Sequence, residues 1–148
     1  MKFLQELFLN KVLLSAVLSW IVAQSIKTLI AFIKTKHFDA KWITGSGGMP
    51  SGHTASVCAL TTEIAIISGA DSVEFALSFV LSAVVIYDSL NIRKAAGDHA
   101  KVLNKMILST LNGEEPLNSK LFRELLGHKP IEVIAGALLG IVIALLVQ

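Results

Sequence analysis

The 148-residue chain has little cysteine, proline or charge. Its one cysteine, Cys58, excludes an intrachain disulfide, and no Cys or His cluster has the spacing of metal ligands. Only 16% of the residues are charged, against about a quarter in an ordinary soluble domain. The net charge is +2, and basic and aromatic residues are not interleaved, so nucleic-acid binding has no support. We therefore predict no disulfide, no metal, no cofactor and no nucleic-acid partner.

Apolar residues make up 53% of the chain, and the mean hydropathy is +0.67. They gather in four runs, at about 12–33, 54–69, 74–87 and 131–147. A membrane-crossing helix needs roughly 17–25 residues, so the first and last runs qualify by length. The two middle runs are short and cross if they tilt or if the bilayer thins. No small-residue cleavage site follows the first run, which predicts a retained span rather than a signal peptide.

These patterns predict an all-α fold in a single domain, residues 1–148. It is an integral membrane helical bundle of about four transmembrane helices plus an interfacial amphipathic helix. Gln24 and Lys27 in the first span are expected to face protein, because exposing them to lipid is costly. The segment 92–111 keeps its apolar residues on one face, as a helix at the membrane surface or packed on the bundle does. The predicted helices cover about 11–34, 53–69, 73–89, 92–111 and 130–147.

The distribution of positive charge predicts the orientation. If all four runs cross, the segments 34–52 and 88–130 share one face of the bilayer. That face holds ten of the thirteen Lys and Arg residues: Lys34, Lys36, Lys41, Arg93, Lys94, Lys101, Lys105, Lys120, Arg123 and Lys129. By the positive-inside rule this face is cytoplasmic, and both termini lie on the opposite side. The membrane is the cell membrane if the source is bacterial.

Residues 49–55 read Met-Pro-Ser-Gly-His-Thr-Ala and stand just before an apolar run. Pro50 favours an extended turn. Ser51 and Gly52 can leave two backbone N–H groups unpaired at a helix N-terminus, where the macrodipole favours an anion. His53 stands beside them and exchanges a proton near neutral pH. The pattern indicates phosphate chemistry, although a plain helix cap explains the same residues.

A second stretch, residues 126–140, contains His128 and Glu132 four residues apart, on one face of a helix. A carboxylate there can hold the imidazole N–H and support its positive charge while the other nitrogen attacks. An interfacial His–Glu pair at a helix start is the alternative. Gly136 and Gly140 continue this face as a small-residue stripe that another helix can approach closely, and are one candidate contact for a homodimer.

Taken together, the chain resembles the type 2 phosphatidic-acid phosphatase superfamily. The closer resemblance is to its divergent branch, the acid phosphatase/vanadium-dependent haloperoxidase-related membrane proteins. The superfamily pattern is a Lys followed after six residues by Arg-Pro, then Pro-Ser-Gly-His, then Ser-Arg-x5-His-x3-Asp. The resemblance covers most of residues 20–145. It rests on Gly-Gly-Met-Pro-Ser-Gly-His-Thr-Ala at 47–55, Tyr-Asp at 87–88 with Arg-Lys-Ala-Ala-Gly at 93–97, and Gly-His-Lys-Pro-Ile-Glu-Val at 127–133.

The resemblance implies that His128 is the nucleophile and His53 the general acid. Glu132 takes the place of the orienting Asp. The Ser51 hydroxyl and the Gly52 N–H would hold phosphate oxygens.

The resemblance also implies a cationic set of Lys27, Lys34 and Arg93 around the phosphate. Lys34 stands where the family has Arg, which keeps the charge and loses the bidentate fork. Arg93 is preferred for the third motif because Arg123 is one residue out of register. Arg93-x5-His99 also matches the third motif, but Leu103 occupies the orienting position, so His99 is interpreted as structural or interfacial.

The resemblance thus implies a membrane-embedded phosphatase. It would hydrolyse a lipid-linked phosphomonoester or diphosphate through a phosphohistidine intermediate at the cytoplasmic face. The alternative is a non-catalytic membrane protein that binds phosphate or phospholipid headgroups in a degenerate phosphatase pocket, which Glu for Asp and Lys for Arg favour. A third reading is a small transport or channel subunit with Lys27 and Glu63 in a polar path. Lipid phosphate, prenyl diphosphate and a soluble phosphoester all stay open as substrates.

Overall fold

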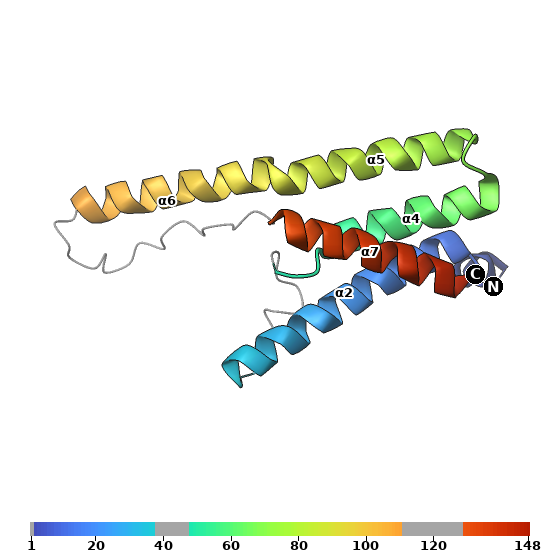
Figure 1. The fold of residues 1–148 in the computed structure, drawn as a ribbon, viewed down its shortest axis with the longest axis horizontal. Helices are drawn as coiled ribbons and strands as arrows, with labels where there is room; N and C mark the ends of the chain where they lie inside the picture. The colour runs from blue at the N-terminus through green and yellow to red at the C-terminus, as the bar shows by residue number, and fades with distance from the viewer. Residues whose placement is uncertain (1, 38–47, 111–128) are drawn as a thin grey trace.

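The computed structural model describes residues 2–37, 48–110 and 129–148. Over these residues the regular structure is entirely helical, which confirms the predicted all-α class (Figure 1). The helices are α1 Lys2–Phe8, α2 Lys11–Thr35, α4 Gly52–Ser68, α5 Val73–Leu90, α6 Ile92–Thr110 and α7 Pro130–Val147. Within the described ranges, α2, α5 and α7 are long and apolar enough to cross a membrane. The fourth helix of the bundle, α4, has 17 residues.

The helices begin where short polar side chains stand just ahead of apolar runs. Asn10, Ser51 and Ser72 are the N-caps of α2, α4 and α5, and their side-chain oxygens accept backbone N–H groups at 3.0, 3.5 and 3.1 Å. These bonds satisfy donors that the first helical turn leaves without an intrahelical partner. Pro130 occupies the first turn of α7, where its missing N–H costs nothing.

The centre of the bundle is α4, which packs against α2, α5 and α7. It runs in the same direction as α7 and opposite to α2 (Figure 1). Small side chains fill the contacts: Ser15, Ala16, Ser19 and Ala23 on α2, Ala55 and Ala59 on α4, and Gly136, Gly140 and Ala144 on α7. Large apolar side chains such as Leu77, Val80 and Leu138 point outward. This is the arrangement of a membrane bundle, in which small residues allow close helix approach and lipid covers the large ones.

The glycine stripe of α7 is used inside the chain. A Cβ on Gly136 would lie 2.5 Å from the backbone oxygen of Ser51, and one on Gly140 would overlap the backbone oxygen of Ala55. Both glycines therefore allow α7 to lie directly on the backbone of α4. The expectation that they offer a contact to a second copy is wrong, because α4 already occupies that face.

Hydroxyl groups join α4 to α5. Thr61 Oγ1 donates to the backbone oxygen of Ser78 at 3.1 Å and lies 2.8 Å from Ser82 Oγ. Ser82 Oγ in turn lies 3.0 Å from the backbone oxygen of Val57, to which it donates. These bonds satisfy polar groups that lipid would leave without partners.

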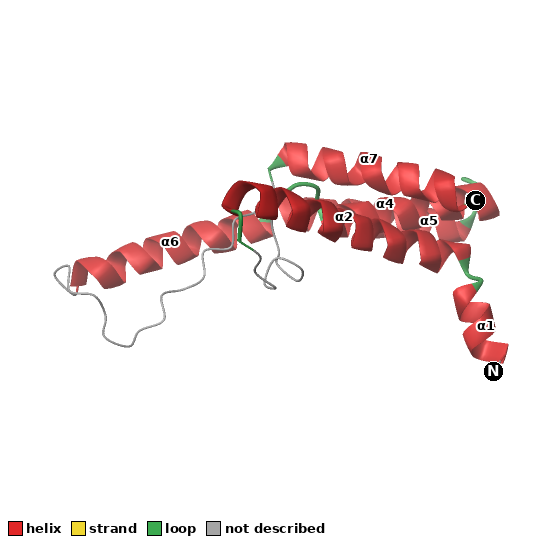
Figure 2. Cartoon of the chain, turned by 90° about the horizontal axis from the view of Figure 1, so that it is seen from below, coloured by secondary structure: helices red, strands yellow, loops and turns green. Residues whose placement is uncertain are grey.

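Helix α6 continues the line of α5 away from the bundle (Figure 1, Figure 2). Asn91 between them keeps helical torsion angles, and its N–H donates to the backbone oxygen of Tyr87 at 3.1 Å. Val102, Leu103 and Met106 are exposed on α6. Of the two positions that the sequence allowed for this helix, packing along the bundle is not seen among the described helices, and a position at the membrane surface stays a prediction.

The bundle has two distinct ends. Both termini lie at one end, together with the turn from α4 to α5 (Figure 1), and Lys11 Nζ donates to the backbone oxygen of Gln148 at 2.5 Å. The start of α4, the end of α5 and the start of α7 lie at the other. The motifs singled out in the sequence therefore begin at one end of the molecule.

Candidate active site

The Pro-Ser-Gly-His turn forms the start of α4, and Ser51 is its N-cap. Ser51 Oγ accepts the Thr54 backbone N–H at 3.5 Å and the Thr54 hydroxyl at 3.0 Å. The Ser51 backbone N–H donates to the backbone oxygen of Glu132 at 2.9 Å. The expectation of an unpaired N–H at Ser51 is therefore wrong, since α7 takes this donor. The Ser51 hydroxyl can still donate a hydrogen bond, and the positive end of the α4 dipole favours an anion at the turn.

This turn packs against the first two turns of α7. Ser51 packs on Gly136, which is six residues beyond Pro130, and six helical residues span about 9 Å. Pro50, Ser51 and Gly52 are buried, whereas the His53 side chain is exposed. The turn is therefore covered by α7 at this end of the bundle, and His53 is its exposed residue.

Lys27 and Glu132 lie near this turn, on α2 and α7. The Lys27 side chain is half-buried and would meet a Cβ on Gly48 at 3.3 Å from its Cγ. The Glu132 carboxylate interacts electrostatically with the Lys27 ammonium group, and its Oε2 accepts the Lys129 backbone N–H at 3.2 Å. An acidic side chain in the first turn of α7 also suits the helix dipole. The structure thus brings Lys27, Glu132 and the Pro-Ser-Gly-His turn together.

The other residues singled out in the sequence lie elsewhere on the helices or outside the described residues. Lys34 is exposed and lies seven residues beyond Lys27 on α2, about 10 Å farther along the helix axis. Arg93 lies in the first turn of α6, at the same end of the bundle. His128 and Arg123 lie outside the described residues. His99 is exposed on α6.

Glu63 stands apart from this group. It is eleven residues beyond Gly52 on α4, about 16 Å along the axis. It is fully buried, and within the described part of the chain neither carboxyl oxygen has a hydrogen-bond partner. Lys27 lies at the opposite end of α4 beside Gly48. The structure therefore gives no support to a polar path that joins Lys27 to Glu63.

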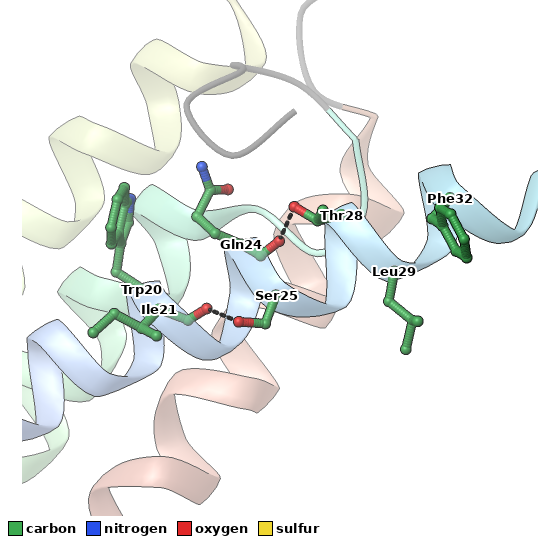
Figure 3. Close-up of a pocket in the computed structure, with 7 residues that line it drawn as sticks. All are labelled: Trp20, Ile21, Gln24, Ser25, Thr28, Leu29 and Phe32. Atoms are coloured by element: carbon green, nitrogen blue, oxygen red, sulfur yellow. Dashed lines mark hydrogen bonds between the residues drawn. The ribbon is translucent and has the colours of Figure 1, made fainter. Parts of the chain in front are cut away.

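Two side chains of α2 that carry no motif also reach the turn. A Cβ on Gly52 would lie 3.3 Å from Trp20 Cδ1 and 3.5 Å from Gln24 Oε1. Both residues also line a groove of about 670 Å³ along α2, with Ile21, Ser25, Thr28, Leu29 and Phe32 (Figure 3). The sequence does place Trp20, Gln24 and Lys27 on one stripe of a helix, at spacings of four and three. It does not show which element this stripe faces.

The relation to known proteins agrees with this geometry. The Divergent PAP2 family matches residues 8–143. The chain belongs to the divergent PAP2 family. It is 39% identical over 150 residues to the "Uncharacterized membrane protein YuiD" of Bacillus subtilis (strain 168), and the match covers 95% of each chain. No solved structure matches the chain. The divergent branch to which the motifs pointed is thereby confirmed, and this PAP2 member is a membrane protein by its apolar helices.

Proposed function

We propose that this divergent PAP2 protein is a membrane-embedded phosphatase that hydrolyses a lipid-linked phosphomonoester or diphosphate. The observation that carries the proposal is the Pro-Ser-Gly-His turn at the start of α4, which packs on α7 near Lys27 and Glu132 at one end of a membrane bundle. A helix N-terminus, a hydroxyl group, a cation and an exposed histidine together suit a phosphoryl group and its departing oxygen.

The proposed reaction has two steps. His128 attacks phosphorus in line and forms a phosphohistidine, while His53 protonates the departing ester oxygen. A water molecule, which gives a proton back to His53, then attacks phosphorus, and phosphate leaves His128. Lys27, Lys34 and Arg93 neutralise charge on the equatorial oxygens, which supplies most of the catalysis in phosphoryl transfer. Ser51 and Gly52 hold the same oxygens through O–H and N–H groups.

A lipid substrate is supported by the setting of the turn. Large apolar side chains surround the bundle, and Trp20 and Gln24, which line the groove along α2, also contact Gly52, so the turn is close to the surface that lipid covers. A phosphoester anchored in the bilayer reaches such a site by lateral diffusion. We place the site on the cytoplasmic side because the sequence segments 34–52 and 88–130, which contain ten of the thirteen basic residues, begin or end in helices at this end.

One observation favours the second candidate, a phosphate-binding protein without turnover. Glu132 accepts the Lys129 backbone N–H and interacts electrostatically with Lys27, and both are interactions that a purely structural residue would make. A carboxylate used in this way contributes less to the orientation of a histidine.

The deciding experiment measures phosphate release by the purified protein in detergent. The substrates are phosphatidic acid, phosphatidylglycerophosphate and prenyl diphosphates, each tested beside His128→Ala and His53→Ala. We expect release from at least one substrate, inhibition by vanadate, and loss of release in both variants. Vanadate binding without release above that of the variants would replace the phosphatase with the binding protein.

A further inference from the structure

A buried carboxyl group lies on the contact between α4 and α7, away from the Pro-Ser-Gly-His turn. Ala55, Ala59 and Glu63 follow one another at spacings of four, so they share one face of α4. A Cβ on Gly140 would overlap the Ala55 backbone oxygen and lie 2.9 Å from the Ala59 backbone nitrogen, so this face is turned to α7. The two helices run in the same direction (Figure 1), and Ala144, which is fully buried, comes one turn after Gly140. Glu63 therefore follows on the face of α4 that packs against the small residues of α7.

The carboxyl group of Glu63 has no partner within the described part of the chain. None of its surface is exposed, and neither oxygen has a hydrogen-bond partner among these residues. A buried carboxylate has to be paired with a positive charge or neutralised, because desolvation of a bare ion is very costly. An apolar side chain would serve packing alone better, and ionisable residues kept inside a membrane bundle mark functional positions. The environment of Glu63 thus calls for a positive partner.

The helices that pack on α4 place their own charges elsewhere. The titratable side chains toward the site end of α2, α4, α5 and α7 are Lys27, Lys34, His53, Tyr87, Asp88 and Glu132. Cys58 lies five residues before Glu63 and so on another face of α4. Lys11 and Glu74 lie toward the other end, but both are exposed, and Lys11 Nζ donates to the backbone oxygen of Gln148 at 2.5 Å. The positive partner of Glu63 is therefore sought outside these helices.

We propose that Glu63 binds a small monovalent cation, either a proton or Na⁺, between α4 and α7. A single carboxylate is neutralised by one positive charge, whereas a divalent ion would leave a net charge in the apolar interior. The cation reaches the site from the end where the termini lie, because α4 ends at Ser68, five residues or about 7–8 Å beyond Glu63. This site uses none of the residues of the proposed phosphatase and does not depend on that function.

The test is labelling of the full-length protein in lipid nanodiscs by dicyclohexylcarbodiimide, an apolar reagent that modifies protonated carboxyl groups. The carboxyl proton moves to one carbodiimide nitrogen, the carboxylate oxygen bonds to the central carbon, and transfer of the acyl group to nitrogen gives a stable acylurea that retains every atom of both reactants. Mass spectrometry of the α4 peptide locates the adduct. We expect labelling of Glu63 that slows as the pH rises. Glu63→Gln should abolish it, and Glu74→Gln, which removes an exposed carboxyl group of α5, should leave it unchanged.

Exchange of KCl for NaCl at constant pH distinguishes the two cations. If Na⁺ is the ligand, a concentration about ten times its dissociation constant should slow the labelling about tenfold, because about a tenth of the sites stay free. If the proton is the ligand, the exchange should change the rate by less than about twofold, since Na⁺ does not compete for the carboxylate. Either result supports a monovalent cation site.

Infrared spectroscopy in Na⁺-free buffer tests the same group without a reagent. The difference between wild type and Glu63→Gln should show the C=O band of an un-ionised carboxyl group, and this band should decrease as the pH rises. A carboxylate signal at every pH, together with no labelling of Glu63, would overturn the inference, because a group of the protein would then neutralise the carboxylate. Recovery of the band and of the labelling in Lys11→Met would identify Lys11 as that group.

Discussion

At the scale of single residues, the chemistry of Glu63 fits its surroundings poorly. The side chain is fully buried in the bundle, and within the described residues no group bonds to either oxygen. Burying a polar group without a hydrogen bond costs roughly 1–3 kcal/mol on the scale of protein mutations. Glu132 on α7 differs, because its carboxylate accepts the Lys129 backbone N–H and interacts electrostatically with the Lys27 ammonium group.

This contrast predicts opposite effects of neutral substitutions at the two positions. Glu63→Leu removes a buried polar group without a partner, so the free energy of unfolding should rise by about 1–3 kcal/mol. Glu63→Gln should leave it unchanged within about 1 kcal/mol. Glu132→Gln weakens a cap and removes the electrostatic interaction with Lys27, so it should lower the free energy of unfolding by about 1 kcal/mol. Unfolding of the detergent-solubilised variants, followed by helical circular dichroism, measures all three. A clear loss of stability in Glu63→Leu would mean that the carboxyl group is bonded in the membrane-embedded protein.

The sequence predicts residue environments better than residue neighbours. It placed Gln24 and Lys27 against protein because lipid penalises both, and the structure confirms this, with Gln24 buried and Lys27 half-buried. It did not reveal that Trp20 and Gln24 meet Gly52, because that contact depends on where α2 crosses α4. It also predicted an unpaired Ser51 N–H, because the sequence of this turn does not show that the backbone oxygen of Glu132 lies beside it.

At the scale of elements, the sequence shows where a helix begins but not which helix it packs against. The starts of the helices can be predicted from the sequence, as the Ser51 cap of α4 and Pro130 in the first turn of α7 show. Periodicity shows that Gly136 and Gly140 share a face, but it does not say whether a neighbour in the same chain or a second copy covers it. The partner is α4, at the centre of the bundle, where close approach of two backbones requires residues without a Cβ.

Gly140→Ala tests this close approach. Alanine in a helix is favoured over glycine by about 1 kcal/mol, so propensity alone predicts a more stable protein. The added Cβ would overlap the Ala55 backbone oxygen and lie 2.9 Å from the Ala59 backbone nitrogen, and backbone atoms yield less readily than side chains. Overpacking costs typically 1–3 kcal/mol, so we expect a net loss of about 1–2 kcal/mol in the unfolding free energy.

The matched control adds one carbon on the outer face of the same helix. Val142 is exposed, so Val142→Ile should change the stability by less than about 0.5 kcal/mol. A Gly140→Ala protein that is more stable than wild type would show that α7 does not rest on α4 as described.

At the scale of the whole molecule, the distribution of side-chain size suits a membrane, and the distribution of charge predicts the orientation. Small residues lie between the helices and large apolar residues outside, so the bundle is stable where lipid, rather than water, covers its surface. The termini lie at one end and the candidate site at the other. Most basic residues in the described part of the chain belong to segments that begin or end at the site end, so the positive-inside rule predicts that the candidate site faces the cytoplasm.

Cysteine labelling in intact cells tests that link. Replacing the single native cysteine by Cys58→Ala gives a background without thiols. Ala70→Cys then adds an exposed thiol in the turn between α4 and α5, and Lys36→Cys adds one at the site end. Because the end richer in Lys and Arg is retained in the cytoplasm, a membrane-impermeant maleimide should label Ala70→Cys in intact cells and Lys36→Cys only after permeabilisation. The reverse pattern would move the proposed site to the outer leaflet and change its accessible substrates. Equal labelling of both thiols in intact cells would contradict a membrane-crossing orientation of α2 and α4, on which the proposed site depends.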